Sequence, residues 1–198
     1  MKVSTMKGGA ADLASPGSAA WNSVVGESVS LGAIPAAAQP TAYIREAWAK
    51  RAYASTSSAK VAAVSDGDRL YVRIEWPDDA KANGEFPDGA GVVFPGAANS
   101  PVETLGSASA PVGLWCWQAG RDEALDIESR GPGVFRRQAG DGVKAAAALA
   151  GGKWTVVLSG PAAAAKGGKL GVVVWNGSNE ERAGLGAVSK SWLGLEQA

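Results

Sequence analysis

The sequence has 198 residues with 19 basic and 19 acidic side chains, so its formal net charge is zero. A neutral chain exerts no long-range attraction on nucleic acids or anionic membranes, and no apolar run approaches the roughly 20 residues of a membrane-spanning helix. Histidine is absent, which removes the commonest general base and metal ligand and excludes Ser–His and Cys–His nucleophile pairs. The length is typical of one domain with a substantial core.

The first 20 residues are rich in glycine, alanine and serine. This composition predicts a flexible N-terminal arm, poorly ordered or laid over another surface, followed by a single domain over residues 21–198. The basic residues of the arm precede no apolar segment of the kind that a secretory signal contains. We therefore expect a cytoplasmic protein, with the periplasm as the alternative if the chain is trimmed or exported with a partner.

The chain from Trp21 onward predicts short elements separated by turns. Residues 21–31 alternate loosely between apolar and polar side chains, which indicates a first strand. Residues 32–41 contain two prolines and suit a loop. Residues 44–53 fit a short helix, a strand or an irregular link equally well.

The clearest element is a hairpin. Residues 60–64 form a short apolar run, Asp66-Gly67-Asp68 is a strong turn, and residues 70–76 alternate strictly. The pattern places Leu70, Val72, Ile74 and Trp76 on one face of the second strand. Further strands are predicted at 89–94, 112–118, 125–128, 134–137, 144–149, 153–159 and 169–175. The total of about ten short strands predicts an all-β fold, an antiparallel β-sandwich or barrel.

The residues alone indicate no catalytic constellation. Carboxylates cluster at Asp78-Asp79, at Asp122-Glu123 with Asp126 and Glu128, and at Glu180-Glu181, but none has the spacing of a calcium loop. We interpret them as solvated loop charges and expect no metal site. The single cysteine, Cys116, lies between Trp115 and Trp117 on an alternating strand. It should face away from the two indoles, and we expect a buried, inert thiol.

Three segments carry a family resemblance: FPDGAGVVFPG at 86–96, PVETLGSASAPVGLWCWQAG at 101–120, and VVVWNGSNEERAGLGAVSKSWLGLE at 172–196. Together with Trp21 and the hairpin strand, they resemble the γ subunit of ethylbenzene dehydrogenase and its relatives. These are the haem-b-binding subunits of the type II dimethyl sulfoxide reductase family, which also occur in chlorate, selenate and dimethyl sulfide enzymes. The resemblance implies a β-sandwich of the DOMON-like, cytochrome-domain type.

The resemblance also implies partners and a cofactor. Members of this family work with a catalytic subunit that carries a molybdenum bis-pterin cofactor and with a ferredoxin-like subunit that carries iron–sulfur clusters. The γ subunit relays electrons through a haem b held by a methionine and a lysine. In this sequence the corresponding positions are Leu105 and Gly186, neither of which can ligate iron. The fallback ligands are Cys116 and Lys190.

Three hypotheses follow. The first is a non-catalytic, structural and haem-free γ-like subunit of a molybdenum–iron–sulfur oxidoreductase, and it is the one that the missing ligands favour. The second is a haem b electron-transfer subunit of the same complex with unusual ligands. The third is a stand-alone carbohydrate-binding β-sandwich, in which Trp115 and Trp117 stack on a sugar ring.

Overall fold

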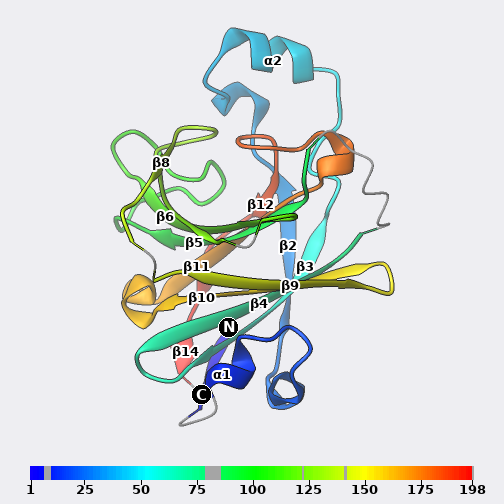
Figure 1. The fold of residues 1–198 in the computed structure, drawn as a ribbon. Helices are drawn as coiled ribbons and strands as arrows, with labels where there is room; N and C mark the ends of the chain where they lie inside the picture. Colours follow the sequence, from blue (N-terminus) through cyan, green and yellow to red (C-terminus); the bar gives the residue numbers. More distant parts are fainter. Residues whose placement is uncertain (7–9, 79–85, 122, 141, 198) are drawn as a thin grey trace.

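The computed structural model describes residues 1–6, 10–78, 86–121, 123–140 and 142–197. They form two β-sheets packed face to face, shown as stacked layers in Figure 1. All strand pairs are antiparallel except those that β1 makes with β3 and β14. The predicted all-β, antiparallel sandwich is therefore confirmed.

The two sheets share one strand. Strand β2 (Glu27–Ala33) pairs through its first half with β3 of the first sheet and through its second half with β12 of the second sheet. The hydrogen-bonded order is consequently continuous, β8-β7-β6-β5-β11-β12-β2-β3-β4-β10-β9.

The first sheet contains β1 (Lys2–Thr5), β3 (Ser58–Ser65), β4 (Arg69–Pro77), β9 (Lys144–Ala150), β10 (Lys153–Pro161) and β14 (Glu196–Gln197). The second sheet contains β5 (Gly89–Pro95), β6 (Val112–Gln118), β7 (Leu125–Ser129), β8 (Phe135–Arg137), β11 (Lys169–Trp175) and β12 (Ala187–Ser189). Strand β13 (Leu193–Gly194) pairs with β11. The helices are α1 (Ala10–Leu13) and α2 (Ala42–Trp48), with 3-10 turns η1 (Ala19–Ser23), η2 (Ala36–Ala38), η3 (Ala162–Ala165) and η4 (Gly177–Asn179).

The main core lies between the sheets. Strict alternation along β4 sends Leu70, Val72, Ile74 and Trp76 into it, as the hairpin pattern predicted. The facing sheet contributes its own alternate residues, including Val92, Phe94, Trp115, Trp117, Val172 and Val174. The two sheets are thus held together by apolar side chains that occupy every second position of their strands.

The N-terminal residues cover the outer face of the first sheet. Strand β1 pairs with β3, and Leu13 and Trp21 pack on Val64, Tyr71 and neighbouring side chains. The indole N–H of Trp21 donates to the Leu13 carbonyl at 3.2 Å. The structure thus lays part of the predicted arm on the domain itself.

One predicted element differs from the structure, and one that was left open is resolved. Residues 21–31 were expected to form one strand, but Trp21 belongs to η1 and β2 begins at Glu27. The side chain of Ser18 accepts from the Ala20 amide and starts the 3-10 turn, a local contact that competes with extension. The ambiguous segment near residue 44 is helix α2, whose first turn is capped by the Thr41 hydroxyl accepting from the Ile44 amide.

Candidate functional site

The outer face of the second sheet carries the residues that build a cavity. Pairing between β11, β5 and β6 aligns Trp175, Gly89 and Gln118 in one row across the strands. The next outward-facing row contains Gly91 and Cys116. This face therefore has two glycines at its centre, where a sheet normally carries side chains.

The glycines decide where the indole of Trp175 lies. A Cβ at Gly89 would sit 3.2 Å from Cε3 of Trp175 and 3.1 Å from the Trp117 carbonyl oxygen. The missing side chain therefore lets the ring approach the strand closely. The indole N–H donates to the Ala183 carbonyl at 2.9 Å, which ties the ring to the loop after η4.

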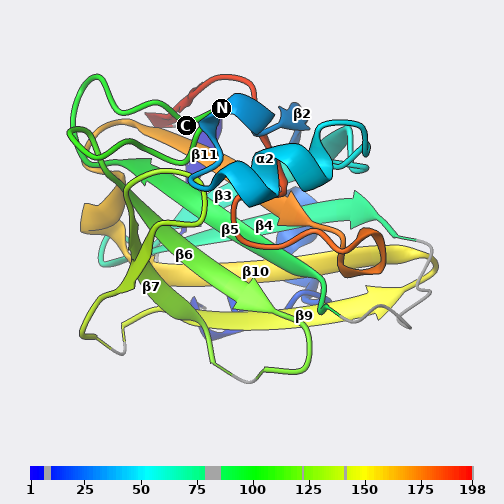
Figure 2. The ribbon, with the colours of Figure 1, turned by 90° about the horizontal axis from the view of Figure 1, so that it is seen from above.

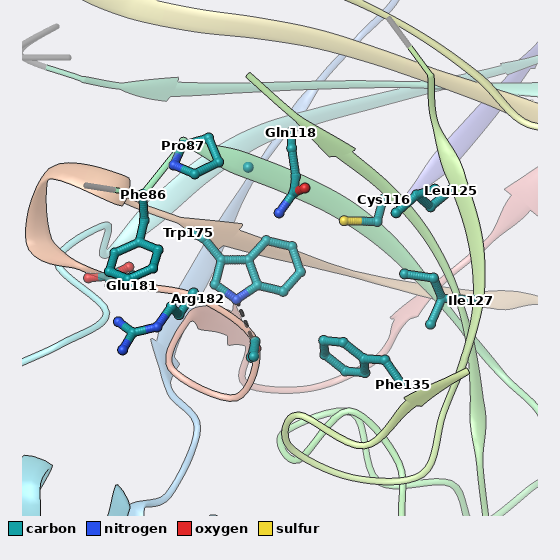
Figure 3. A pocket seen from close by; sticks show the side chains of 12 residues that line it. Phe86, Pro87, Cys116, Gln118, Leu125, Ile127, Phe135, Trp175, Glu181 and Arg182 are labelled. Carbon is teal, nitrogen blue, oxygen red and sulfur yellow. Dashed lines mark hydrogen bonds between the residues drawn. The ribbon is translucent and has the colours of Figure 1, made fainter. Parts of the chain in front are cut away.

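The cavity beside this ring has a volume of about 380 Å³, within the range of small-molecule sites. Figure 3 shows Cys116, Leu125 and Ile127 on one side and Phe135 below Trp175. The loops around it contribute Phe86, Pro87, Glu181, Arg182 and Ala183, and the strands add Gly89 and Gln118. The wall is thus largely apolar and aromatic.

Glu181 is the buried acid of the cavity wall. It has no exposed surface, and its carboxylate accepts from the Ser55 amide at 2.8 Å, the Asn176 amide at 3.0 Å and the Asn179 side-chain amide at 2.9 Å. Three donors compensate its burial. The contacts show that Glu181 holds the loop that follows β11 against residue 55.

Arg182 supplies a positive charge at the mouth of the cavity. Its guanidinium carbon lies 3.9 Å from the centre of the Phe86 ring, a cation–π contact. One of its N–H groups donates to the Glu180 carbonyl at 2.7 Å. The wall of the cavity therefore combines an aromatic surface with one cation that is already in contact with Phe86 and Glu180.

Cys116 lies in the cavity wall, on the opposite side of β6 from its two neighbouring tryptophans. The prediction that the thiol and the indoles face opposite ways is confirmed. Burial raises the pKa of the Cys116 thiol to about 12, against a weaker opposing effect of the Arg121 charge. The group is a thiol at neutral pH, and only the thiolate is a nucleophile or a metal ligand.

Leu105 and Gly186, the positions predicted to match the family's haem ligands, are not among the residues that line the cavity. Leu105 has no exposed surface and packs within the apolar cluster on the outer face. Its φ of +54° is left-handed, and its carbonyl accepts from the Ser129 hydroxyl at 2.6 Å. At Gly186, an added Cβ would lie 2.6 Å from Nε1 of Trp175. The indole therefore occupies the space into which a side chain at position 186 would extend.

Lys190, the second fallback ligand, is exposed. Its methylene chain covers β2, because a Cβ at Gly32 would lie 3.2 Å from Cε of Lys190. The structure brings Cys116 to the cavity wall but places Lys190 elsewhere.

The remaining candidates are the carboxylates of the acidic clusters, and three of them form ion pairs. Glu123, Glu128 and Glu180 pair with arginines at 3.4, 2.7 and 2.7 Å, while Asp79 and Asp122 lie outside the described residues. Within the described ranges, no three His, Cys, Asp or Glu side chains gather as a metal site would require. The structure describes no helix with the length and apolarity needed to cross a bilayer.

Trp115 and Trp117 are 2% and 5% exposed, respectively. Both belong to the core between the sheets. The sugar-stacking role considered for this pair under the third hypothesis is therefore contradicted, because both rings are almost completely buried.

Sequence reasoning found part of the cavity. Phe86, Trp175 and Arg182 lie in the segments that carry the family resemblance, although nothing in the sequence indicated that they share a cavity. Phe135 was missed, because its three-residue strand carries no informative pattern.

Comparisons with known proteins find relatives that are named as reductase subunits. It is 30% identical over 191 residues to a protein of Haloferax mediterranei provisionally named respiratory nitrate reductase heme subunit ORF7, covering 88% of this chain and 65% of the relative. It is 34% identical over 161 residues to the chlorate reductase subunit gamma of Ideonella dechloratans, covering 72% and 66%. The chain thus spans just under two thirds of the length of both relatives. No family model matches it.

A solved structure from Bacteroides uniformis, provisionally named a carbohydrate-binding protein, superposes with a TM-score of 0.52. The match covers 100% of this chain and 92% of that chain at 12% identity, so it bears on the fold alone. Together, the sequence relatives confirm the predicted resemblance to γ-type subunits of reductase complexes.

Proposed function

We propose that this chain, a relative of the γ and haem subunits of reductase complexes, is a non-catalytic accessory subunit of a molybdenum–iron–sulfur oxidoreductase and binds no haem. Its partners are a molybdopterin catalytic subunit and a ferredoxin-like iron–sulfur subunit. We also propose that the complex belongs to the type II dimethyl sulfoxide reductase family and resembles ethylbenzene dehydrogenase. The cytoplasmic location stays a prediction, with the periplasm as its alternative.

The two ligand positions carry the haem-free part of the proposal. Leucine at position 105 has no atom that can donate to iron, and its backbone is held by the Ser129 hydroxyl. Position 186 lacks a side chain, and Trp175 fills the adjoining space. A lysine introduced there would have to displace an indole that is itself bonded to the Ala183 carbonyl. The residues present therefore do not fit a haem held by a methionine–lysine pair.

An accessory role agrees with the remaining chemistry. The buried carboxylate of Glu181 is fully used by three donors within the loop, and the Cys116 thiol stays protonated. The protonated thiol is not a nucleophile at neutral pH. In this role the chain supplies a rigid sandwich and a docking surface, and electrons leave the complex from an iron–sulfur cluster in a partner.

The test is to purify the complex by a tag on this chain, identify the co-purifying subunits, and record its absorption spectrum. We expect a molybdopterin subunit and an iron–sulfur subunit, with no pyridine haemochrome that scales with this chain. Partner subunits expressed without this chain provide the background spectrum. A haem b in a one-to-one ratio with the chain contradicts the haem-free part, whereas a chain that purifies without partners contradicts the accessory role.

The alternative is a haem b subunit with unusual ligands, and one observation favours it. Cys116 lines an apolar cavity whose mouth carries the Arg182 guanidinium, and thiolates do hold haem iron in some proteins. Under this alternative, Cys116→Ala changes the haem spectrum of the complex while Lys190→Ala, on the exposed face, leaves it unaltered. If both variants keep the spectrum of the wild type, neither residue is a ligand.

A further inference from the structure

The two ends of the continuous sheet differ in their protection. One end is β8, which has three residues, two of them arginines. The other end is β9, which has seven residues with the sequence KAAAALA. Short, charged edges resist pairing with other chains, whereas long, uncharged edges invite it. By this criterion β8 is protected and β9 is not.

Strand β9 pairs with β10 on one side only, and the sheet order ends there. Figure 2 shows it at the margin of the molecule, beyond β10. Lys144 is its one charged residue, at its first position. Leu149, its one large side chain, is 37% exposed. Alternate backbone groups along this edge point outward, and no strand among the described residues pairs with them.

A groove of about 390 Å³ runs along this edge. Its wall includes the three consecutive residues Ala145, Ala146 and Ala147, together with Trp117, Trp154 and two residues of the loop after β6, Gly120 and Arg121. Consecutive side chains of a strand point to opposite faces of the sheet. A groove that meets all three therefore reaches the backbone of β9 and opens beside this edge strand, between it and the end of β6.

We propose that β9 pairs with β9 of a second copy of this chain, antiparallel and centred on Ala147, and so joins two first sheets into one. The pairing is isologous, as a two-fold dimer requires. In this register Ala145 faces Leu149 of the second copy, Ala146 faces Ala148, and Lys144 faces Ala150. This proposal does not depend on the function proposed above.

Side-chain size supports this register. Ala145 and Ala147 pack toward the core between the sheets, and Leu149 follows the same alternation. Residues directly opposite in an antiparallel pair share a face. The exposed Leu149 of one copy would therefore enter the groove beside Ala145 and Trp117 of the other, twice per dimer. The strand thus carries both a projecting side chain and the space that receives it.

Charge supports the same register. Each Lys144 faces an alanine, and the two lysines are separated by six positions, about 20 Å along the strands. This exceeds the screening length of about 8 Å at physiological ionic strength, so the two charges do not oppose association.

The test is sedimentation velocity of the isolated full chain at concentrations up to about 100 µM, which covers the weak affinities of small interfaces. We expect a reversible monomer–dimer equilibrium. Ala146→Lys with Ala148→Lys places like charges directly opposite at two pairs, and should weaken the dimer at least about tenfold. Ala146→Glu with Ala148→Lys places opposite charges at the same pairs, and should restore or tighten it.

The control is Ala163→Lys, an exposed substitution in η3, which should leave the equilibrium unchanged. Circular dichroism verifies that every variant is folded. A folded wild type that stays monomeric over the whole range overturns the proposal, and so does a Glu/Lys variant that dimerises no better than the Lys/Lys variant. Binding of another protein at this edge without dimerisation contradicts the second copy as its occupant.

Discussion

The inner and outer faces of the second sheet are formed by alternate residues of the same strands, yet they are packed differently. The inner face presents Phe94, Trp115 and Trp117 to the opposing sheet and is densely packed. The outer face presents Gly89, Cys116 and other residues to loops, and a cavity of about 380 Å³ remains there. An opposing sheet packs along the whole inner face, whereas the loops contact the outer face at only a few points. The loop-covered outer face is therefore the one on which a cavity remains.

The largest loss of stability is expected from a substitution on the inner face. Trp115 packs against Phe94 with ring centres 4.6 Å apart and lies over Gly160, where a Cβ would collide with the ring. Trp115→Ala should lower the free energy of unfolding by about 3–5 kcal/mol, since it leaves a large cavity in a packed core. Denaturant unfolding measures the change, with Trp115→Phe as a milder control. A loss below about 1.5 kcal/mol would contradict the dense packing of the inner face.

An intermediate effect is expected from the loop that covers the outer face. Glu181→Ala leaves the donors of Ser55, Asn176 and Asn179 without their acceptor. The free energy of unfolding should fall by about 2–3 kcal/mol, because bonds to a buried charged group are the strong ones. Hydrogen exchange should quicken at the Ser55 and Asn176 amides while the amides of β5 keep their protection. Glu181→Gln retains one acceptor oxygen and serves as the graded control. Unchanged exchange at both amides would show that Glu181 does not hold the loop.

The effect that is smallest near neutral pH concerns Cys116 on the outer face, and it grows only in alkaline solution. Its folded-state pKa of about 12 exceeds the unfolded value of about 8.5, so the folded chain keeps a proton that the unfolded chain releases. The thiol's contribution to stability is complete below pH 8.5 and is lost as the pH rises toward 12, by at most about 1.4 kcal/mol per pH unit.

Cys116→Ala should remove this part of the pH dependence, and the difference between the two unfolding curves isolates the thiol from other titrating groups. In the native wild type the thiol should also react slowly with a disulfide reagent at pH 8 and rapidly in denaturant. Equal slopes for wild type and variant above pH 8.5 would contradict the buried position of the thiol.

The strands were predictable where alternation was strong. The hairpin of β3 and β4 and strands β5, β6 and β11 lie where the residue pattern placed them. The segment at 21–31 was mispredicted because a side-chain bond from Ser18 favours a 3-10 turn at Trp21. The sequence did not distinguish helix from strand at α2, because seven residues carry too little pattern. In the structure the Thr41 cap stabilises the helix.

The candidate site was predictable only in part. The resemblance identified positions 105 and 186, and the identities Leu105 and Gly186 are read directly from the chain. The cavity itself was not predictable, because its wall joins Phe86, Phe135 and Arg182 from segments far apart in the sequence. No local sequence pattern indicates that these distant residues lie side by side.

The sequence by itself determined which residues share a face, because side chains of a strand alternate with a period of two whatever surrounds them. It therefore separated Cys116 from Trp115 and Trp117. Only the tertiary structure decided which face meets the other sheet and what fills the space at each position. The sequence shows that position 186 has no side chain, whereas the fold shows that the indole of Trp175 lies where such a side chain would extend. That second fact depends on packing between distant segments, which no single stretch of the chain specifies.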